Sequence, residues 1–501
     1  MTEPVNHSFP PSGPDDGAVP RPDRHPGGLP HDGAASYDPP GSYDIPAGYG
    51  TSAPYPQQVA PYPGEGDGNA EAAYAGSSAP PHSPQAAARA APPGCPAHEG
   101  EQPFRIGGLE FQRPPADLYR ALRRQYGPVA PVLLDDDVPA WLALGYPEVT
   151  YVTAHDEIFA RDSRRWNQWD AIPGNWPLLP YVGFQPSVLF AEGPEHRRRA
   201  GVISRALEAM DLYDVSLVCE AVGDRLIARF AGAGRAELMR AYVHSVPVRV
   251  IVELCGMPAG EEETEELVRD LRISLDAEEG EDPVAAYGRV GERIHALVED
   301  RRLRPDRDIT SHMTCDPAGL SDEEIVQDLI SVIAAGQQPT ANWICNALRL
   351  LLLDDRFADR LAGGRVGVPE ALNETLWLDT PTQNFIGRWA ARDVELGGRL
   401  IRAGDCVVMG LSAANTDPEV WPEGYVGEEN AANLSFSNGE HRCPHPAPQI
   451  ARVIAQTAID TLLGRLPDVA MAVEGEALRW RPSIWMRGLE ELPVTFSPTV
   501  M

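Results

Sequence analysis

The sequence predicts a mainly helical fold with a smaller β portion, of the α+β class. From about Pro103 onward, apolar residues recur at the three- and four-residue spacing of amphipathic helices. Short β-like segments stand between them, as at 141–144 (Trp-Leu-Ala-Leu) and 407–409 (Val-Val-Met). A chain of 501 residues can bury a large core. We therefore expect a large helical body that carries a small sheet.

The first hundred residues differ in composition from the rest of the chain. From Met1 to about Gly100, proline, glycine, alanine and serine dominate, and branched apolar residues are too few to offset chain entropy. We predict a disordered extension over residues 1–102, either a passive tail or a docking segment, and a folded domain over 103–501. No charged start followed by an apolar core opens the chain, so a secretory signal is not expected.

Charge and cysteine content exclude several classes of partner and site. The net charge of -31 repels nucleic acid and anionic membranes at long range. No apolar run approaches the roughly 20 residues that cross a bilayer, so no membrane span is expected. The cysteines lack pair spacing, which indicates a reducing, cytoplasmic environment and no zinc site. They are Cys95, Cys219, Cys255, Cys315, Cys345, Cys406 and Cys443.

The predicted elements begin with two helices, at 110–126 and at 147–159, followed by a loop at 160–164. A much longer helix is predicted in the second half of the chain. Ser321 and Glu324 form a capping box, and the apolar period from there to Leu353 corresponds to about eight helical turns.

One cysteine stands at the end of a glycine-containing loop, directly before a long amphipathic stretch. Residues 436–443 read Phe-Ser-Asn-Gly-Glu-His-Arg-Cys. A thiolate at Cys443 suits an axial iron ligand, Gly439 lets the backbone pass close to a porphyrin, and His441 can reach a carboxylate. The alternative is that Cys443 is a small buried hydrophobic residue at a helix start.

This loop resembles the proximal heme loop of the cytochrome P-450 family, Phe-Gly-x-Gly-x-His-x-Cys-x-Gly. Phe436 and Gly439 match that pattern, whereas Ser437 and His445 replace two of its glycines. The resemblance covers roughly 103–499 and is clearest from residue 321 onward. It implies that heme b (iron protoporphyrin IX) lies between the long central helix and the proximal cysteine loop, with Cys443 as the iron ligand.

The resemblance also implies a distal site on the central helix, where this chain departs from the family. The family's Ala-Gly is followed by any residue, an acid and a threonine, and here Gln338 and Pro339 take the places of the acid and the alcohol. Ala335 and Gly336 supply the small residues that let a helix approach a flat ligand, or another helix, closely. Glutamine cannot exchange a proton near pH 7, although its amide can orient a water.

Two further expectations concern Pro339 and the residue that follows it. Pro339 lacks the amide hydrogen of a regular helix and should kink it, at a cost of roughly 3 kcal/mol in a straight helix. Thr340, on the same face as Gly336, is the candidate for a replacement alcohol. Alternatively, its hydroxyl bonds back to a carbonyl of the preceding turn.

The resemblance implies three contacts to the heme carboxylates. These are His196 at a helix start, Arg388 in a strand and His441 in the cysteine loop. Ala200 occupies the place of a further arginine, so Arg199 or its preceding neighbour would have to reach a carboxylate instead. The alternatives are that Arg388 is an exposed strand arginine, and that the arginine cluster at the helix start is a solvated face or a docking site for an acidic partner.

A second departure concerns the helix at 373–377 (Asn-Glu-Thr-Leu-Trp). The family has Glu-x-x-Arg here, and Trp377 replaces the arginine. The stretch 421–427, where the family usually places another arginine, has none. We expect the Trp377 side chain to pack in the support of the loop and the Glu374 carboxylate to accept hydrogen bonds from neutral donors. Glu374 would then have a structural role.

The residues after the cysteine predict an electron-rich sulfur. Pro444 and Pro446 have no amide hydrogen to offer to the thiolate, and fewer hydrogen bonds should lower the iron potential.

In function, the resemblance implies a heme-thiolate monooxygenase that hydroxylates a small apolar molecule with dioxygen and electrons. A ferredoxin and a ferredoxin reductase would supply the electrons, because no flavin or dinucleotide motif occurs in the chain. The alternatives are a heme-binding protein with little turnover, acting as a ligand sensor or assembly partner, and a peroxide-using variant. Trp169, Trp176 and Phe184 either line the substrate cavity or belong to the core.

Overall fold

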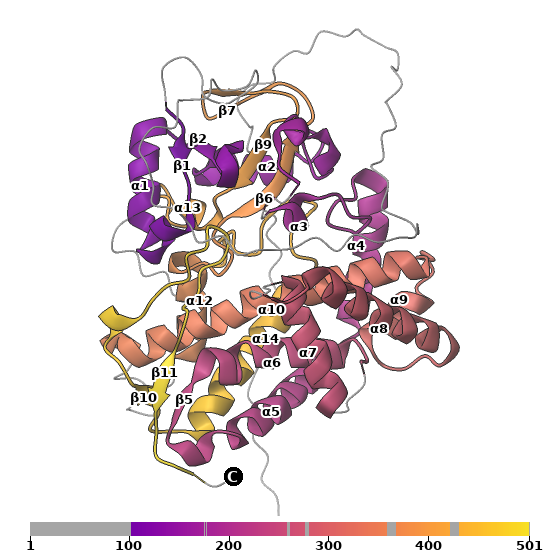
Figure 1. Ribbon diagram of the computed structural model, residues 1–501, viewed down its shortest axis with the longest axis vertical. Coiled ribbons are helices and arrows are strands. Elements are labelled where there is room, and N and C mark those ends of the chain that lie inside the picture. The colour runs from indigo at the N-terminus through magenta and orange to yellow at the C-terminus, as the bar shows by residue number, and fades with distance from the viewer. Residues whose placement is uncertain are drawn as a thin grey trace, which may run out of the picture. The chain divides into compact units, whose positions relative to one another are not determined.

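A six-stranded sheet and a set of helices around one long helix make up the computed structural model (Figure 1). The structure describes residues 102–499 except 175, 177, 258–260, 276–279, 358–366 and 421–429. All of these residues belong to one unit, Ala87–Met501. Apart from Gln102, the predicted N-terminal extension lies outside the described residues.

The large sheet joins strands that are far apart in the sequence. The predicted β segments near 141 and 407 lie in neighbouring parallel strands, where Trp141 pairs with Val407, so that prediction is confirmed. The strand order is β1 (Phe104–Arg105), β2 (Val129–Leu133), β3 (Pro139–Ala143), β9 (Cys406–Met409), β6 (Phe385–Ala390) and β4 (Phe159–Ala160).

Two smaller sheets and two isolated β-bridges, Thr382–Met486 and Trp480–Leu489, lie elsewhere in the described residues. One joins β10 (Ala470–Met471), β11 (Pro493–Thr495) and β5 (Arg235–Glu237). The other is the hairpin of β7 (Val394–Leu396) and β8 (Arg399–Ile401).

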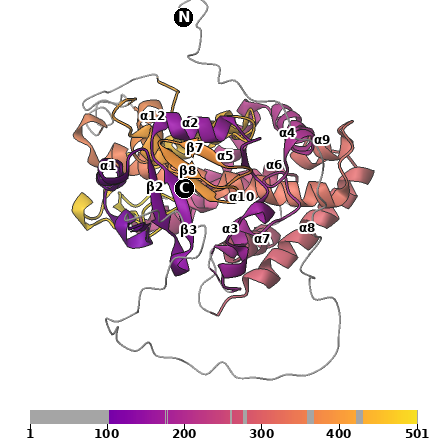
Figure 2. The same ribbon diagram turned by 90° about the horizontal axis from the view of Figure 1, so that it is seen from above.

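Helices make up most of the remaining structure (Figures 1 and 2). Those before the long helix are α1 (Pro115–Tyr126), α2 (Tyr146–Ala154), α3 (Leu179–Val182), α4 (Gly193–Glu208), α5 (Leu212–Ala228), α6 (Ser245–Leu254), α7 (Glu261–Leu275), α8 (Pro283–Leu303) and α9 (Ile309–Cys315). The long helix is α10 (Asp322–Leu353), followed by α12 (Val368–Leu378), α13 (Leu411–Asn415) and α14 (Ala447–Arg465). Single helical turns lie at Gly108–Gln112, Asp135–Asp137, Ser163–Arg165, Trp169–Ala171, Ala231–Ala233, Met239–Val243 and Gly475–Ala477.

The second predicted helix was too long. α2 ends at Ala154, because Phe159 and Ala160 pair with β6 as the edge strand β4 instead of continuing the helix. These residues form a strand despite their helical sequence pattern, because strand pairing and burial determine the conformation of a short apolar segment more strongly than its intrinsic propensity does.

Helix α10 is the centre of the helical part and packs against α6, α8, α12 and α14. The Ser321 hydroxyl accepts from the Glu324 amide and the Glu324 carboxylate accepts from the Ser321 amide, which confirms the capping box. α10 runs through Pro339 as one element of 32 residues, and the kink expected there stays a prediction. The buried residues of α10, among them Trp343, belong to the largest apolar core, and packing on several sides holds the helix together across the proline.

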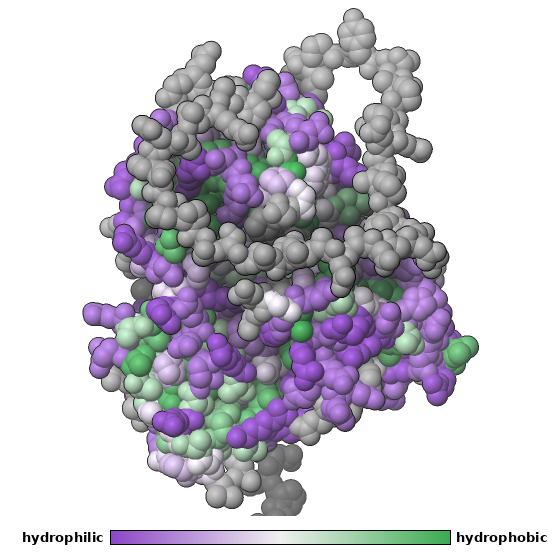
Figure 3. All heavy atoms as spheres, viewed as in Figure 1, coloured by the Kyte–Doolittle hydropathy of each residue, from purple (hydrophilic) through white to green (hydrophobic). Residues whose placement is uncertain are grey.

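The sheet has an apolar core on each face. Along β3, Leu142 packs into one core and its neighbours Trp141 and Ala143 into the other, as strand alternation requires. Hydrophilic side chains dominate the visible described surface in Figure 3, as the acidic composition suggests. No described helix has the length and the apolarity to cross a bilayer.

A buried ion pair ties α4 to α10 near the start of both helices. The Arg199 guanidinium donates to both carboxylate oxygens of Asp328, over 2.9 and 2.6 Å. The Asp328 carboxylate also accepts from the Val188 amide at 2.7 Å, and both charged side chains are at most 5% exposed. Such a pair fixes the two helices relative to each other, because either charge alone would be costly to bury.

We predict that Asp328→Ala lowers the free energy of unfolding by about 3–5 kcal/mol, because it leaves the Arg199 charge buried and unpaired. The matched control is Asp117→Ala, which removes a carboxylate from the exposed pair with Arg120 and should cost about 0–1 kcal/mol. Urea unfolding of both variants measures the difference. Equal losses in the two variants would show that the buried pair has no special weight.

Candidate functional site

The loop that carries Cys443 closes on itself and packs against α10. The Cys443 amide donates to the Phe436 carbonyl at 3.0 Å. The Phe436 ring lies edge-on to Trp343 of α10, with 5.8 Å between ring centroids. Directly after the loop, α14 begins at Ala447, as the amphipathic stretch predicted. These contacts hold the cysteine close to the central helix.

Cys443 is half-buried in the loop. Burial raises the pKa of the Cys443 thiol to about 12, so the thiolate needs a cation beside it to form. No donor among the described residues forms a hydrogen bond to this sulfur. Pro444 and Pro446 have no amide hydrogen, and the Ala447 amide donates to the Pro444 carbonyl instead.

Two loop residues have left-handed backbone conformations. Gly439 has a φ of 76°, and an added Cβ would overlap the carbonyl oxygen of Thr153. Ser437 has a φ of 61°, although a side chain is present. The loop thus keeps a glycine-like conformation at a position where the family pattern has glycine and this chain has serine, at a cost of roughly 1–2 kcal/mol.

A pair of histidines joins the loop to the start of α4. The rings of His196 and His441 lie 3.7 Å apart, and His196 Nδ1 is 3.3 Å from a carboxylate oxygen of Glu440. His441 Nε2 is buried and finds no hydrogen-bond partner in the described part of the chain. Burial, followed by the neighbouring positive charges, lowers the pKa of His441 far below its ordinary value. His441 therefore stays neutral and has an unused nitrogen.

Two buried arginines lie near these histidines. Arg388 donates to the Phe159 carbonyl at 3.1 Å, and its Nε has no partner among the described residues. Arg161 donates to the carbonyls of Gly387 and Leu189 at 2.6 and 2.9 Å. Sequence reasoning gave Arg161 no role. Its position in the predicted 160–164 loop, together with the absence of an arginine at position 200, was the available signal.

The arginines at the start of α4 are already paired with acids. Arg199 is bound by Asp328, Arg198 by Glu195 and Glu324, and Arg197 by Glu440. The contact of Arg199 with a heme carboxylate stays a prediction, and in this structure its charge is neutralised by α10.

The distal turn of α10 exposes a face made of small and apolar side chains. Ala335 is exposed and Pro339, one turn further, is partly exposed. Gly336 faces α6, where an added Cβ would lie 2.7 Å from Ile251 Cδ1. Thr340, which follows Gly336 by one turn, is 4% exposed. The geometry brings Ala335 and Pro339 to the open face, whereas Thr340 lies on the packed side.

Gln338, which stands where the family has its acid, is partly exposed beside this open face. Its neighbour Gln337 is buried, and the Gln337 Oε1 has no hydrogen-bond partner within the described residues.

The partner of Glu374 differs from the one that we expected. We expected neutral donors, yet Arg356, just after α10, pairs with the Glu374 carboxylate at 2.6 Å. Trp377 is fully buried, as predicted, and its indole nitrogen donates to the Asn430 carbonyl at 2.9 Å. The tryptophan therefore ties α12 to the segment before the cysteine loop. The stretch 421–427 lies outside the described residues.

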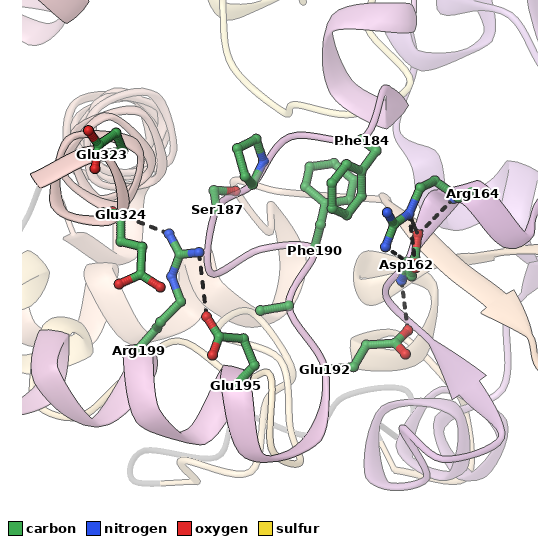
Figure 4. A pocket seen from close by; sticks show the side chains of 12 residues that line it. Asp162, Arg164, Phe184, Ser187, Phe190, Glu192, Glu195, Arg199, Glu323 and Glu324 are labelled. Atoms are coloured by element: carbon green, nitrogen blue, oxygen red, sulfur yellow. Dashed lines mark hydrogen bonds and ion pairs between the residues drawn. The ribbon is translucent and has the colours of Figure 1, made fainter. Parts of the chain in front are cut away.

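A pocket of about 450 Å³ opens at the starts of α4 and α10 (Figure 4). Figure 4 shows Arg199 between Glu195 and α10, and Arg164 against Asp162 across the pocket. Cys443 is not among its lining residues, so this pocket is separate from the cysteine. Its lining consists of Asp162, Arg164, Phe184, Pro186, Ser187, Phe190, Ala191, Glu192, Glu195, Arg199, Glu323 and Glu324.

The aromatic residues suggested for a substrate cavity divide between surface and core. Trp176 is 2% exposed, packs against Trp166 and donates to the Asp135 carbonyl, so it belongs to the core. Trp169 packs on the same indole of Trp166 and is partly buried. Phe184 lines the pocket of Figure 4 under the Arg164 guanidinium.

The donor groups fit a heme. Cys443 needs a cation to carry a thiolate, whereas Arg161 and Arg388 need anions. Arg388 Nε and His441 Nε2 are buried polar atoms with no partner in the described structure. An iron porphyrin with two carboxylates offers a metal to the sulfur and negative charge to the cations. Gly439 leaves no side chain between Thr153 and the loop backbone.

Comparison with known proteins gives one consistent result. The family model for cytochrome P450 matches residues 368–463. A vitamin D(3) 25-hydroxylase from Pseudonocardia autotrophica is 30% identical over 395 residues, which are 77% of this chain and 95% of that protein. The cytochrome P450 monooxygenase PikC from Streptomyces venezuelae is 29% identical over 405 residues, 77% of this chain and 92% of that protein. The structure of CYP154C4 from a Streptomyces species matches with a TM-score of 0.69 at 27% identity, over 79% of this chain and 98% of that one.

We predict that Gly439→Ala sharply lowers heme content and costs about 2–4 kcal/mol of stability, because the new Cβ meets the Thr153 carbonyl in a left-handed backbone. The control is Ser437→Gly, which relieves the strain at the same loop and should leave stability unchanged or raise it by up to about 1 kcal/mol. The heme-to-protein absorbance ratio and urea unfolding measure both. A Gly439→Ala protein with full heme content would disprove the close-packing argument.

Proposed function

The chain belongs to the cytochrome P450 family, whose members bind heme b, and on this premise we propose that it is a heme-thiolate monooxygenase that hydroxylates a small apolar molecule. The observation that carries the proposal is that the site contains one group that requires a cation and a cluster of groups that require anions. The half-buried Cys443, whose thiol has a raised pKa, has no cation beside its sulfur, and the buried Arg161 and Arg388 have no anion in an ion pair within the described residues. Heme b satisfies both, and when bound it supplies the activation of dioxygen.

Each residue of the site has a role in holding this group. Cys443 binds the iron, and the absence of donors to its sulfur leaves the negative charge on the thiolate. Arg388 and His441 donate to the carboxylates, and His196 supports the His441 ring by contact. Phe436 anchors the loop against α10.

The distal turn handles protons without an acid side chain. Pro339 has no amide hydrogen, so the Ala335 carbonyl loses its usual helical donor and can accept a hydrogen bond from a water on the open face. The Gln338 amide can orient such a water, although it cannot act as an acid. We infer that water, held by Ala335 and Gln338, delivers protons in this protein. Thr340 stays a predicted alternative, and its burial supports a packing role.

Electrons come, in this proposal, from a separate ferredoxin and ferredoxin reductase. The chain contains no flavin or dinucleotide motif that could serve as an internal donor. The names of the relatives support an apolar organic substrate class, because one of them is a vitamin D(3) 25-hydroxylase.

One observation favours a second candidate function. The open face of α10 presents Ala335 and Pro339, neither of which has a protic side chain, while Thr340 is buried. A heme-binding protein with little turnover, acting as a ligand sensor or assembly partner, would tolerate such a face.

The reduced, carbon monoxide-bound absorption spectrum separates these candidates. For a monooxygenase we expect a red-shifted thiolate-type Soret band when a ferredoxin, its reductase and a nicotinamide cofactor supply the electrons. A thiolate band obtained only with a strong chemical reductant would favour the sensor. The absence of any heme band would overturn both proposals.

We predict that Pro446→Ala raises the iron reduction potential by on the order of 60 mV, the one-electron equivalent of one charge-assisted hydrogen bond. The substitution gives the segment after Cys443 an amide that can donate to the sulfur. Spectroelectrochemical titration of the holoprotein measures the potential. The control is Pro283→Ala at the first residue of α8, which removes a proline from another helix start, away from the cysteine loop. An unchanged potential in Pro446→Ala would refute the argument from missing donors.

A further inference from the structure

Two arginines meet where β4 runs beside β6. Phe159 pairs with Ala390 and Ala160 pairs with Trp389, so the next antiparallel step sets Arg161 opposite Arg388. Both side chains are buried, at 5% and 1% exposure. Like charges directly opposite each other in a β pair are destabilising, and more so when water is excluded. Such a pair requires a compensating negative charge.

Arg161 is held in place by neutral groups. Its Nη1 and Nε donate to the carbonyls of Gly387 and Leu189, and its guanidinium lies 5.1 Å from the centre of the Phe385 ring. Gly387 has a φ of 123°, and an added Cβ would lie against Arg161 Nη1, so a glycine makes room for this side chain. These contacts orient the guanidinium and do not neutralise it.

Within the described part of the chain, the acids whose charges act on the two arginines lie beyond ion-pair distance: Glu192 acts on both, and Asp156 acts on Arg388. Neither Arg161 nor Arg388 forms an ion pair there. Two acids close to the cluster are paired with other arginines. Asp162 pairs with Arg164, and Glu192 pairs with Arg165 and accepts from the Asp162 amide.

The charge of the cluster acts on its neighbours. Burial, and then the Arg388 charge, lower the pKa of Arg161 to about 9, so Arg161 stays charged at neutral pH. The partnerless Arg388 Nε and His441 Nε2 belong to this same cluster. Two fixed positive charges with open donor atoms fit a ligand with two carboxylates.

We propose that Arg161 binds a heme carboxylate together with Arg388, in place of the arginine that the chain lacks at Ala200. Arg199 cannot make up that loss while Asp328 holds its guanidinium. In the holoprotein the two carboxylates then neutralise the two arginines, and heme binding relieves the repulsion across the β4–β6 pair. The proposal rests on heme b binding and not on monooxygenase turnover.

The test compares heme with its dimethyl ester, in which both carboxylates are blocked. Arg161→Gln and the unaltered chain are each reconstituted with both cofactors, and cofactor release to excess apomyoglobin is timed. For native heme we expect Arg161→Gln to release roughly 10- to 100-fold faster, because one charge-assisted contact is lost. For the dimethyl ester the two proteins should release at the same rate within about twofold. Resonance Raman spectra of the native-heme proteins should show a shifted propionate vibration in Arg161→Gln.

Arg164→Gln is the matched control, since Arg164 is exposed, is paired with Asp162 and lies three residues away. It should leave the release rate and the propionate vibration unchanged. Faster release of native heme and dimethyl ester alike from Arg161→Gln would overturn the proposal and assign Arg161 to the support of the Gly387 and Leu189 carbonyls. Unchanged release and an unchanged vibration would overturn it as well.

If Arg161→Gln does not fold, Arg161→Lys serves instead, because lysine keeps the charge and changes the geometry of the contact. A shifted propionate vibration with slow heme release is the expected result. An identical vibration in Arg161→Lys and the unaltered chain would contradict the contact. Because each readout follows heme and not turnover, loss of monooxygenase activity leaves this test intact.

Discussion

The site depends on buried charges that the described protein does not neutralise by itself. Cys443 is placed where a thiolate needs a cation, and Arg161 and Arg388 are placed where guanidinium groups need anions. Buried unpaired charge is costly, so the protein without cofactor carries a penalty that heme removes. Folding and cofactor binding are thereby linked, because the ligand binds only the folded chain and stabilises it by mass action.

The helices around the loop compensate for the family features that this chain has lost. Trp377 donates to the Asn430 carbonyl where an arginine would have bridged to the loop, and Arg356 supplies the positive charge that Glu374 requires. The Phe436 ring against Trp343 connects the same loop to α10. A half-buried carboxylate is stabilised by a cation, so the pair with the exposed Arg356 explains how the chain keeps Glu374 after losing the arginine.

Local sequence patterns predicted helices, strands and the cysteine loop, but they did not predict which charged side chains lie beside one another. The capping box at Ser321, the strands near 141 and 407, and the cysteine loop were all readable, because each depends on residues within a few positions of one another. The pairing of Arg356 with Glu374 was not, since those residues are 18 positions apart and no local sequence pattern links them. Arg161 was missed for a related reason. A role for Arg161 is indicated only by its position opposite Arg388, which is more than 200 positions away in the sequence. A single arginine in a loop ordinarily indicates a solvated side chain.

Helix geometry explains why Thr340 cannot replace the threonine that the family has at the position of Pro339. Each residue turns about 100° around the helix axis, so Thr340 points well away from the direction of Pro339. Ala335 and Pro339 share the open face, whereas Thr340 shares the face of Gly336 that packs against Ile251 of α6. The hydroxyl could reach the open face only if α10 rotated, and such a rotation would break the contact at Gly336. The Ala335 carbonyl, which Pro339 leaves without its helical donor, and the Gln338 amide are therefore the polar groups that this turn of α10 offers at its open face.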